Sequence, residues 1–160
     1  MDTKGLRILN NVFEFEFLSR AGMRYLDAVV PEEGHQLDEY LIEGTKGITF
    51  SGQIISNINE SVFESDLADF NAKGTLISRT FRKESEIGYA PDLLNTTLVI
   101  DEKFRKLGNI KHALIDSDYF VEFDLSLDYQ KVEDLLMALH LNVSEAFKKS
   151  CSPFAKERWA

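Results

Sequence analysis

The chain has 160 residues, 44% of them hydrophobic, which is enough for one folded domain and too little for two of ordinary size. Its formal net charge of −9 disfavours nucleic acid and anionic membranes as partners, because an acidic surface repels phosphate groups. The single cysteine, Cys151, excludes an intramolecular disulfide and is typical of a reducing compartment. Since no basic and then apolar leader precedes the first elements, we expect a cytoplasmic protein.

The N-terminal part of the chain is expected to be mostly β-strand. Residues 1–11 are mixed and polar, and we expect them to be loosely ordered. Phenylalanine alternates with glutamate over residues 13–17, which predicts a strand with one apolar face. A second strand is predicted over residues 19–31. Because strand side chains alternate, Arg24 and Tyr25 belong to opposite faces of that strand.

Short elements are predicted along the middle of the chain. Residues 36–43 form a short helix with its leucines and tyrosine inward, and residues 48–55 form a strand. Residues 56–71 fit a helix or a pair of strands equally well. Alternation over residues 75–83 predicts another strand, and β-branched residues predict one over residues 96–101.

The clearest pattern of the chain lies in residues 118–159. Alternating apolar residues from Tyr119 onward predict a half-buried strand. The period then changes to the spacing of a long helix with one apolar stripe, for which Asp128 is the expected N-cap. The stripe contains Val132, Leu135, Leu136, Leu139, Val143, Ala146 and Phe147.

The order of these elements predicts an α+β fold in a single domain over residues 1–160. Strands that follow one another with few helices between them favour an antiparallel sheet. The terminal helix is the one element long enough to cover a face of that sheet. We therefore expect an antiparallel, curved β-sheet covered on one face by a long C-terminal α-helix, together with a short early helix.

Four carboxylates, Asp116, Asp118, Glu122 and Asp124, are the densest group that suggests chemistry. All have even numbers, so they point to the same side of one strand. Such a group suits a hard cation or an acid–base pair. The solvated face of a sheet explains it more simply, so we expect no metal, and Asp116 and Asp118 are only weak candidates for one.

The remaining candidates for chemistry are three histidines and one cysteine. His35, His112 and His140 form no paired metal-ligand motif, and no nucleophile elbow, glycine-rich dinucleotide motif or P-loop occurs, so no cofactor is expected. We expect His140 at the boundary of the helix stripe, where the alternative is a polar group in a cleft. Cys151 has no histidine near it in sequence, which favours a structural or exposed thiol over a nucleophile.

The segment from Arg20 to Asp27, RAGMRYLD, resembles a motif of a sporadically distributed, uncharacterised bacterial protein family, R-x-G-L-R-Y-hydrophobic-N. Met23 replaces the usual leucine of the motif, and Asp27 replaces a common asparagine. The end of the chain is similar too, with a strand of the I-D-x-D kind at residues 115–118 and a leucine–histidine pair at residues 139–140. Members of that family are typically longer, so the resemblance implies that this chain corresponds to their C-terminal part, with no established activity.

Two functions remain open at this point. The first is a non-enzymatic interaction or regulatory domain, which a filled core between helix and sheet would favour. The second is a small-ligand-binding or hydrolase-like domain, in which Arg24, Tyr25 and His140 line an enclosed pocket between helix and sheet. We prefer the first, and we expect a homodimer or another protein partner, because an unpaired sheet edge or exposed phenylalanines would favour association.

Overall fold

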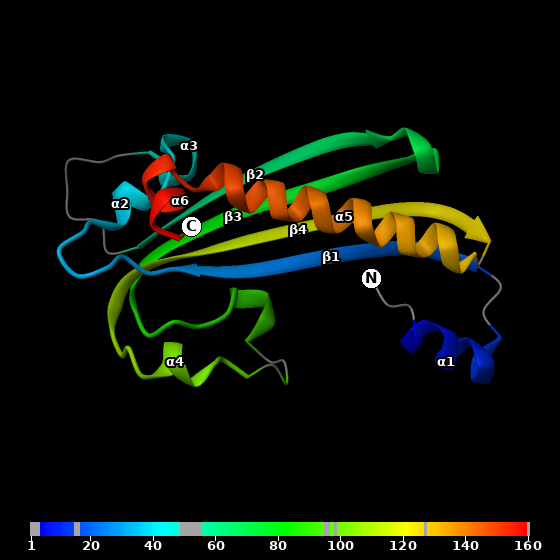
Figure 1. The fold of residues 1–160 in the computed structure, drawn as a ribbon, viewed down its shortest axis with the longest axis horizontal. Helices are drawn as coiled ribbons and strands as arrows, with labels where there is room; N and C mark the ends of the chain where they lie inside the picture. Colours follow the sequence, from blue (N-terminus) through cyan, green and yellow to red (C-terminus); the bar gives the residue numbers. More distant parts are fainter. Residues whose placement is uncertain are drawn as a thin grey trace.

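The chain forms a four-stranded antiparallel sheet with one long helix across it, which confirms the predicted α+β class (Figure 1). The computed structural model describes residues 4–14, 17–48, 56–94, 97, 99–126 and 128–159. Across the sheet the strand order is β1–β4–β3–β2, and every neighbouring pair is antiparallel. The strands are β1 (Phe17–Val29), β2 (Ser56–Leu67), β3 (Ala72–Ser85) and β4 (Ile110–Ser126).

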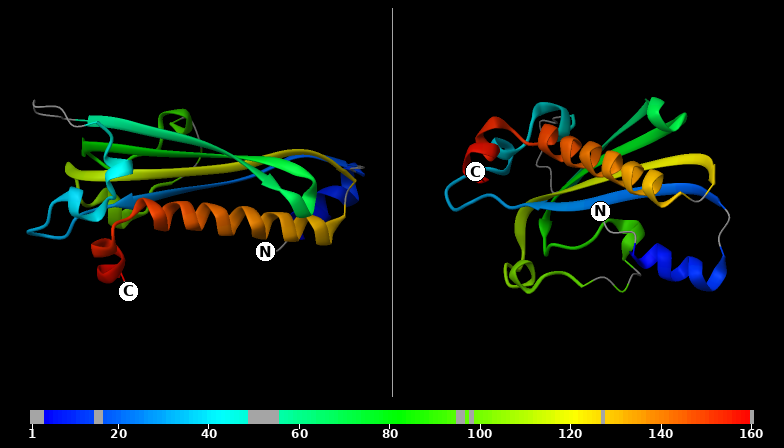
Figure 2. Two further views of the ribbon diagram at one scale, coloured as in Figure 1. Left: turned by 90° about the horizontal axis from the view of Figure 1, so that it is seen from above. Right: turned by 45° about the vertical axis from the view of Figure 1, so that its right-hand side comes forward.

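The long helix, α5 (Tyr129–Ser150), begins where the sequence predicts. The Asp128 side chain accepts hydrogen bonds from the backbone N–H groups of Gln130 and Lys131, which satisfies two donors at the start of the helix. Its apolar stripe packs on β1 and β4, so it crosses only half of the sheet (Figures 1 and 2). The residues of the predicted stripe that become fully buried are Val132, Leu135, Leu139 and Val143.

The strand register gives the sheet two distinct faces. We call the face that carries Tyr25 and Tyr119 and lies against α5 the inner face, and the opposite one the outer face. Under α5 the inner face is a filled apolar core. The Tyr119 ring lies flat over Gly74 of β3, where an added Cβ atom would come within 2.7 Å of the ring carbons. Gly74 therefore leaves the room that this ring occupies.

Three short helices gather at one end of the sheet (Figure 1). They are α2 (Leu37–Tyr40), α3 (Glu43–Lys46) and α6 (Pro153–Trp159). The predicted early helix is confirmed in α2, with Tyr40 fully buried beside the first strand and the C-terminal segment. Leu41 and Cys151 form an isolated antiparallel β-bridge, which connects α2 and α3 to the residues that follow α5.

The described residues between β3 and β4 (86–94, 97 and 99–109) cover part of the outer face. This segment contains a 3-10 turn (Pro91–Leu93) and a short helix, α4 (Glu102–Arg105). Ile87 and Ala90 are buried there, as is Leu114 on the outer face of β4. The sheet therefore has a second, smaller apolar contact on the side away from α5.

The N-terminal part begins with α1 (Lys4–Phe13), a helix that the sequence analysis did not predict. The expected loose order of residues 1–11 stays a prediction. The strand predicted over residues 13–17 is wrong at Phe13, because Phe13 is the last residue of α1. Instead β1 begins at Phe17 and continues as one strand through residues 19–29.

The middle of the chain also differs from its prediction. Residues 56–71, which were open, form β2 and a 3-10 turn (Ala68–Phe70). The strand predicted over residues 96–101 is wrong wherever the structure describes it, since residues 97 and 99–101 are not in a strand. The strand predicted over residues 48–55 lies outside the described residues except for Ile48. None of the helices in the described ranges is long and apolar enough to cross a membrane.

Candidate functional site

Tyr25 and His140 meet on the inner face, as the hypothesis of a polar gap between helix and sheet expects. Tyr25 projects from β1 and His140 from α5, and the Tyr25 hydroxyl is hydrogen-bonded to Nδ1 of His140 at 2.6 Å. Their rings lie edge to face with centroids 5.7 Å apart. Both side chains are half-buried. The pair joins the helix to the sheet by a polar contact at the border of the apolar core.

Arg24 does not join this pair, because it lies on the outer face. Its Nε and Nη2 atoms donate to the two carboxylate oxygens of Asp116 at 2.7 Å each. Its Nη1 and Nη2 atoms also donate to Asp92 at 2.6 and 3.0 Å. The hydrogen bonds that Arg24 donates, chiefly to Asp92 and next to Asp116, raise the pKa of its guanidinium above the ordinary value. The prediction that Arg24, Tyr25 and His140 line one pocket is therefore wrong for Arg24.

The acidic strand face is not a solvated one at Asp116. This carboxylate is 0% exposed and is held between Arg24 and Arg79, whose Nη1 lies 3.5 Å away. Asp118 is half-buried on the same face, and burial raises the pKa of its carboxyl group. Among the described residues, no group of three or more histidine, cysteine or carboxylate side chains is arranged to hold a metal ion. The buried ion pair accounts for Asp116 without one.

The other candidate residues lie apart from one another. His35 sits near the C-terminal helix, with Nδ1 3.2 Å from the Tyr40 hydroxyl. His112 is fully buried on the outer face, where burial lowers the pKa of its imidazole. Burial also raises the pKa of the Cys151 thiol to about 11, so the thiolate is scarce at neutral pH and the residue is structural.

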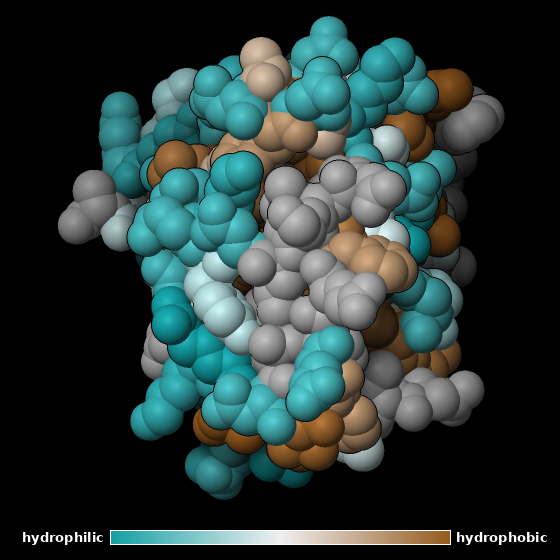
Figure 3. Space-filling view, turned by 90° about the vertical axis from the view of Figure 1, so that its right-hand side faces the viewer, coloured by the Kyte–Doolittle hydropathy of each residue, from teal (hydrophilic) through white to brown (hydrophobic). Residues whose placement is uncertain are grey.

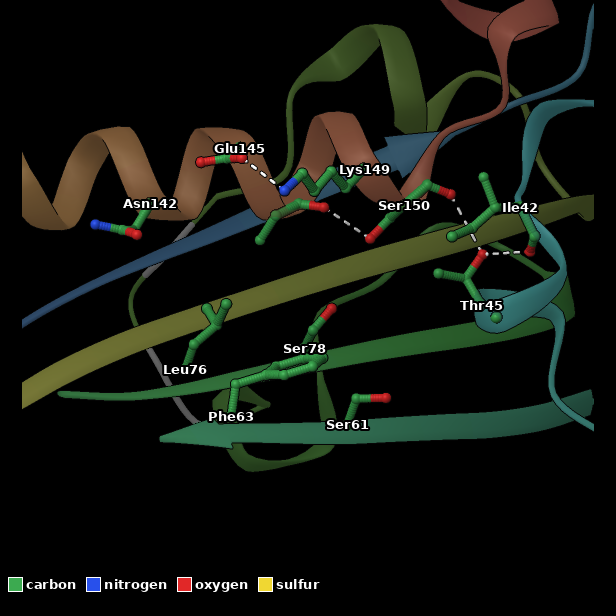
Figure 4. Close-up of a pocket in the computed structure, with 12 residues that line it drawn as sticks. Ile42, Thr45, Ser61, Phe63, Leu76, Ser78, Asn142, Glu145, Lys149 and Ser150 are labelled. Atoms are coloured by element: carbon green, nitrogen blue, oxygen red, sulfur yellow. Dashed lines mark hydrogen bonds and ion pairs between the residues drawn. The ribbon is translucent and has the colours of Figure 1, made fainter. Parts of the chain in front are cut away.

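One hollow among the described residues lies beside α5 rather than beneath it. It has a volume of about 380 Å³ and opens between the C-terminal half of α5 and the inner face of β2 and β3 (Figure 4). It lies where α5, which packs chiefly on β1 and β4, leaves part of the inner face of β2 and β3 uncovered. Twelve residues line it: Ile42, Gly44, Thr45, Ser61, Phe63, Leu76, Ser78, Asn142, Glu145, Ala146, Lys149 and Ser150.

A row of hydroxyl groups crosses the inner face from this pocket to the Tyr25–His140 pair. In the strand register Ser61 lies opposite Ser78, Ser78 opposite Ser117, and Ser117 opposite Tyr25. Ser117 is 0% exposed, and its Oγ atom has no hydrogen-bond partner in the described part of the chain. A buried polar group without a partner costs about 1–3 kcal/mol, so Ser117 is an unusual residue beside the apolar core under α5.

The sequence analysis missed this pocket and its serines. One signal was present, since the alternation of residues 75–83 places Ser78 on the same face as Leu76. The neighbours of Ser78 depend on the strand order, which that pattern does not contain. No family model, curated protein or solved structure matches this chain.

Proposed function

We propose that this chain is a non-enzymatic interaction domain that binds a partner strand along β2, and that the partner is a second copy of the chain. The alternative, a small-ligand-binding or hydrolase-like domain built on Arg24, Tyr25 and His140, needs these three side chains around one enclosed pocket. They are split between the two faces of the sheet, and the space under α5 is filled. This arrangement supports the interaction domain.

The observation that carries the proposal is the exposed edge formed by β2. This strand has 12 residues and pairs only with β3 among the described strands. A long strand at an edge presents unpaired backbone groups to any chain that can extend the sheet. Apolar side chains are exposed on both of its faces: Ile58 (64%), Val62 (57%) and Phe63 (54%).

The charges of β2 favour one particular register for pairing with itself. Antiparallel pairing centred on Ser61 places Glu60 opposite Val62 of the second copy and Glu64 opposite Ile58. Pairing centred on Val62 would place Glu60 opposite Glu64, which is unfavourable because the charges are alike. The first register repeats each contact twice about a two-fold axis, as a closed dimer requires.

Light scattering at micromolar concentration tests the proposal. We expect a mass near twice the 18.3 kDa of the chain. Val62→Glu would place like charges opposite each other in the proposed register and should give a monomer. Val62→Lys would face Glu60 instead and should remain a dimer. The control is Leu141→Glu, because Leu141 is 60% exposed on α5, far from the strand edge, and this variant should also remain a dimer.

Three outcomes would contradict the proposal. A wild-type monomer at the highest soluble concentration would remove the dimer itself. An unchanged mass for Val62→Glu would move the contact away from β2. Dissociation by both Val62 variants, with Leu141→Glu intact, would keep the edge but reject the register centred on Ser61.

Two broader proposals accompany this one. On the motif of residues 20–27 and the end of the chain, we propose a relation to the C-terminal part of the bacterial family that the sequence resembles. The single buried cysteine is consistent with the proposed cytoplasmic location, since a buried thiol persists in a reducing compartment.

A further inference from the structure

We infer that the pocket between α5 and the β2–β3 hairpin binds a small uncharged molecule with an apolar body and one hydroxyl or amide group. The inference does not depend on the dimer, because the residues that line this pocket lie on the inner face and Val62 lies on the outer face. Four features of the pocket carry it: its fixed walls, its apolar surface, its unpaired hydroxyls and its balanced charge.

Hydrogen bonds between the elements that form the pocket fix its walls. Nδ2 of Asn57 donates to the Lys46 carbonyl at 2.8 Å, and Nδ2 of Asn59 donates to the Gly44 carbonyl at 2.6 Å. On the other side, Thr45 Oγ1 donates to the Ser150 carbonyl at 3.3 Å. These bonds hold α3 between β2 and the end of α5, so the hollow is already formed before a ligand arrives.

The surface inside the pocket is mostly apolar. Phe63 and Leu76 form part of its floor and Ile42 part of one wall (Figure 4), and Ala146 also lines it. Phe63 is 54% exposed and Ile42 38% exposed, so a ligand that covers them removes apolar area from water. A volume of about 380 Å³ lies within the usual range for small-molecule sites.

The polar groups on the floor are hydroxyls that await a partner. Ser61 and Ser78 face each other across β2 and β3, and within the described residues neither hydroxyl has a hydrogen bond. Ser117 lies next to Ser78 with a buried, unpartnered Oγ atom, but it does not line the pocket. A hydroxyl both donates and accepts, so Ser61 and Ser78 suit a ligand hydroxyl or amide.

The charges at the pocket balance each other. Lys149 and Glu145 are paired at 2.7 Å on one turn of α5, and this pair also lowers the pKa of the Glu145 carboxyl. The Glu145 carboxylate would repel a carboxylate ligand, and the Lys149 ammonium group would repel an ammonium ligand. A charged ligand would also lose its hydration on entering an apolar hollow. Both effects select an uncharged molecule.

Chemical-shift titration of the ¹⁵N-labelled full chain with octan-1-ol, octanoate and octylammonium tests the inference. These probes share one apolar body and differ in charge. We expect saturable shifts of the Gly44, Ser61 and Ser78 amides with octan-1-ol, and affinity weaker by about tenfold or more for both ions. Shifts spread over the surface, no saturation with octan-1-ol, or equal affinity for all three probes would overturn the inference.

Matched variants locate the site. Ser78→Leu fills the pocket and should abolish the octan-1-ol shifts, whereas Thr75→Leu adds a similar bulk to the outer face of the same strand and should not. Where Ser78→Leu fails to fold by circular dichroism, Ser61→Ala replaces it and should weaken binding by about tenfold through loss of one hydrogen bond. Unchanged binding in the folded pocket variant would overturn the assignment. The mass of each variant shows separately whether the dimer persists.

Discussion

Asp27 is a half-buried carboxylate whose environment disfavours its charge. It lies on the inner face of β1 opposite Ile115, close enough to Cys151 to contribute to the raised pKa of that thiol. Burial raises the pKa of the Asp27 carboxyl group above its ordinary value, and no ion pair in the described residues offsets this. The ionised carboxylate therefore destabilises the folded chain at neutral pH.

We expect Asp27→Asn to increase the free energy of unfolding at about pH 7. Because the folded-state pKa is raised, the cost of the charge is fully present above that pKa. It vanishes as the pH falls to the unfolded value of about 4, where both states bind the proton. Urea unfolding of the two proteins at several pH values measures the difference, which should shrink on acidification.

Asp92 provides a control of opposite sign. Its pKa is lowered, chiefly by the hydrogen bond from Arg24, so its charge stabilises the folded state above the unfolded pKa, and this stability is lost as the pH falls through the folded pKa. Asp92→Asn should therefore destabilise slightly at neutral pH, by less than about 1 kcal/mol because the side chain is mostly exposed. A loss of stability in Asp27→Asn at neutral pH would contradict the desolvation argument.

Adjacent residues show what sequence can and cannot specify about the site. The two-residue period of a strand correctly separates Arg24 from Tyr25 onto opposite faces. The partner of Arg24 is Asp116, which lies 92 residues away, and their contact depends on β1 lying beside β4. This contact depends on strand order, which local sequence patterns do not encode. The prediction that Arg24 and Tyr25 line one gap between helix and sheet was therefore wrong.

At the scale of whole elements, α5 covers the apolar core on the inner face of the sheet. Leu139 is 0% exposed and packs with Tyr119 and Val121 of β4. We expect Leu139→Ala to reduce the free energy of unfolding by about 2–5 kcal/mol, through lost burial and the cavity left behind. Urea unfolding of the variant and of the wild type at one protein concentration measures this change.

Leu141, two residues further along α5, is the matched control. It is 60% exposed, so Leu141→Ala makes the same chemical change on the solvent side of the helix. Its effect should stay within about 0.5 kcal/mol. Equal effects of the two substitutions would mean that α5 does not cover the core as the structure shows.

Element prediction succeeded where burial imposes a pattern and failed where it does not. The core under α5 requires an apolar stripe on the helix and alternation on β3 and β4, and both patterns are readable in the sequence. On β2 the inner face carries Asn57, Asn59 and Ser61, because α5 does not reach this strand. With polar residues on both faces, neither a helical nor a strand period stands out.

The missed helix α1 has a different cause. Ile8 and Val12 are four residues apart, which is helical spacing, but the phenylalanine alternation over residues 13–17 predicts a strand. Both side chains are exposed, at 57% and 70%. Figure 3 shows the end of the molecule near α1, where hydrophobic surface appears low in the view. Ile8 and Val12 therefore contribute little to the core, and the fold prediction did not include their helix.

Across the whole molecule, the strands differ in how far other elements cover them. The strand β4 pairs on both sides, lies under α5 on one face and meets residues 86–109 on the other, and most of its residues from 112 to 121 are buried. By contrast, β2 has one neighbouring strand among the described ones, and α5 packs chiefly on β1 and β4. Backbone opening should therefore be easy at β2 and close to global unfolding at β4.

Amide hydrogen exchange measures this gradient directly. At low protein concentration the amides of β4 should exchange most slowly, and alternate amides of β2, those facing away from β3, should exchange far faster. Raising the concentration should slow these same β2 amides if a second copy pairs with them, since association stabilises only the paired state. The β4 amides should change far less. Equal protection of β2 and β4 at low concentration would contradict an open edge, and protection of β2 that ignores concentration would contradict the dimer.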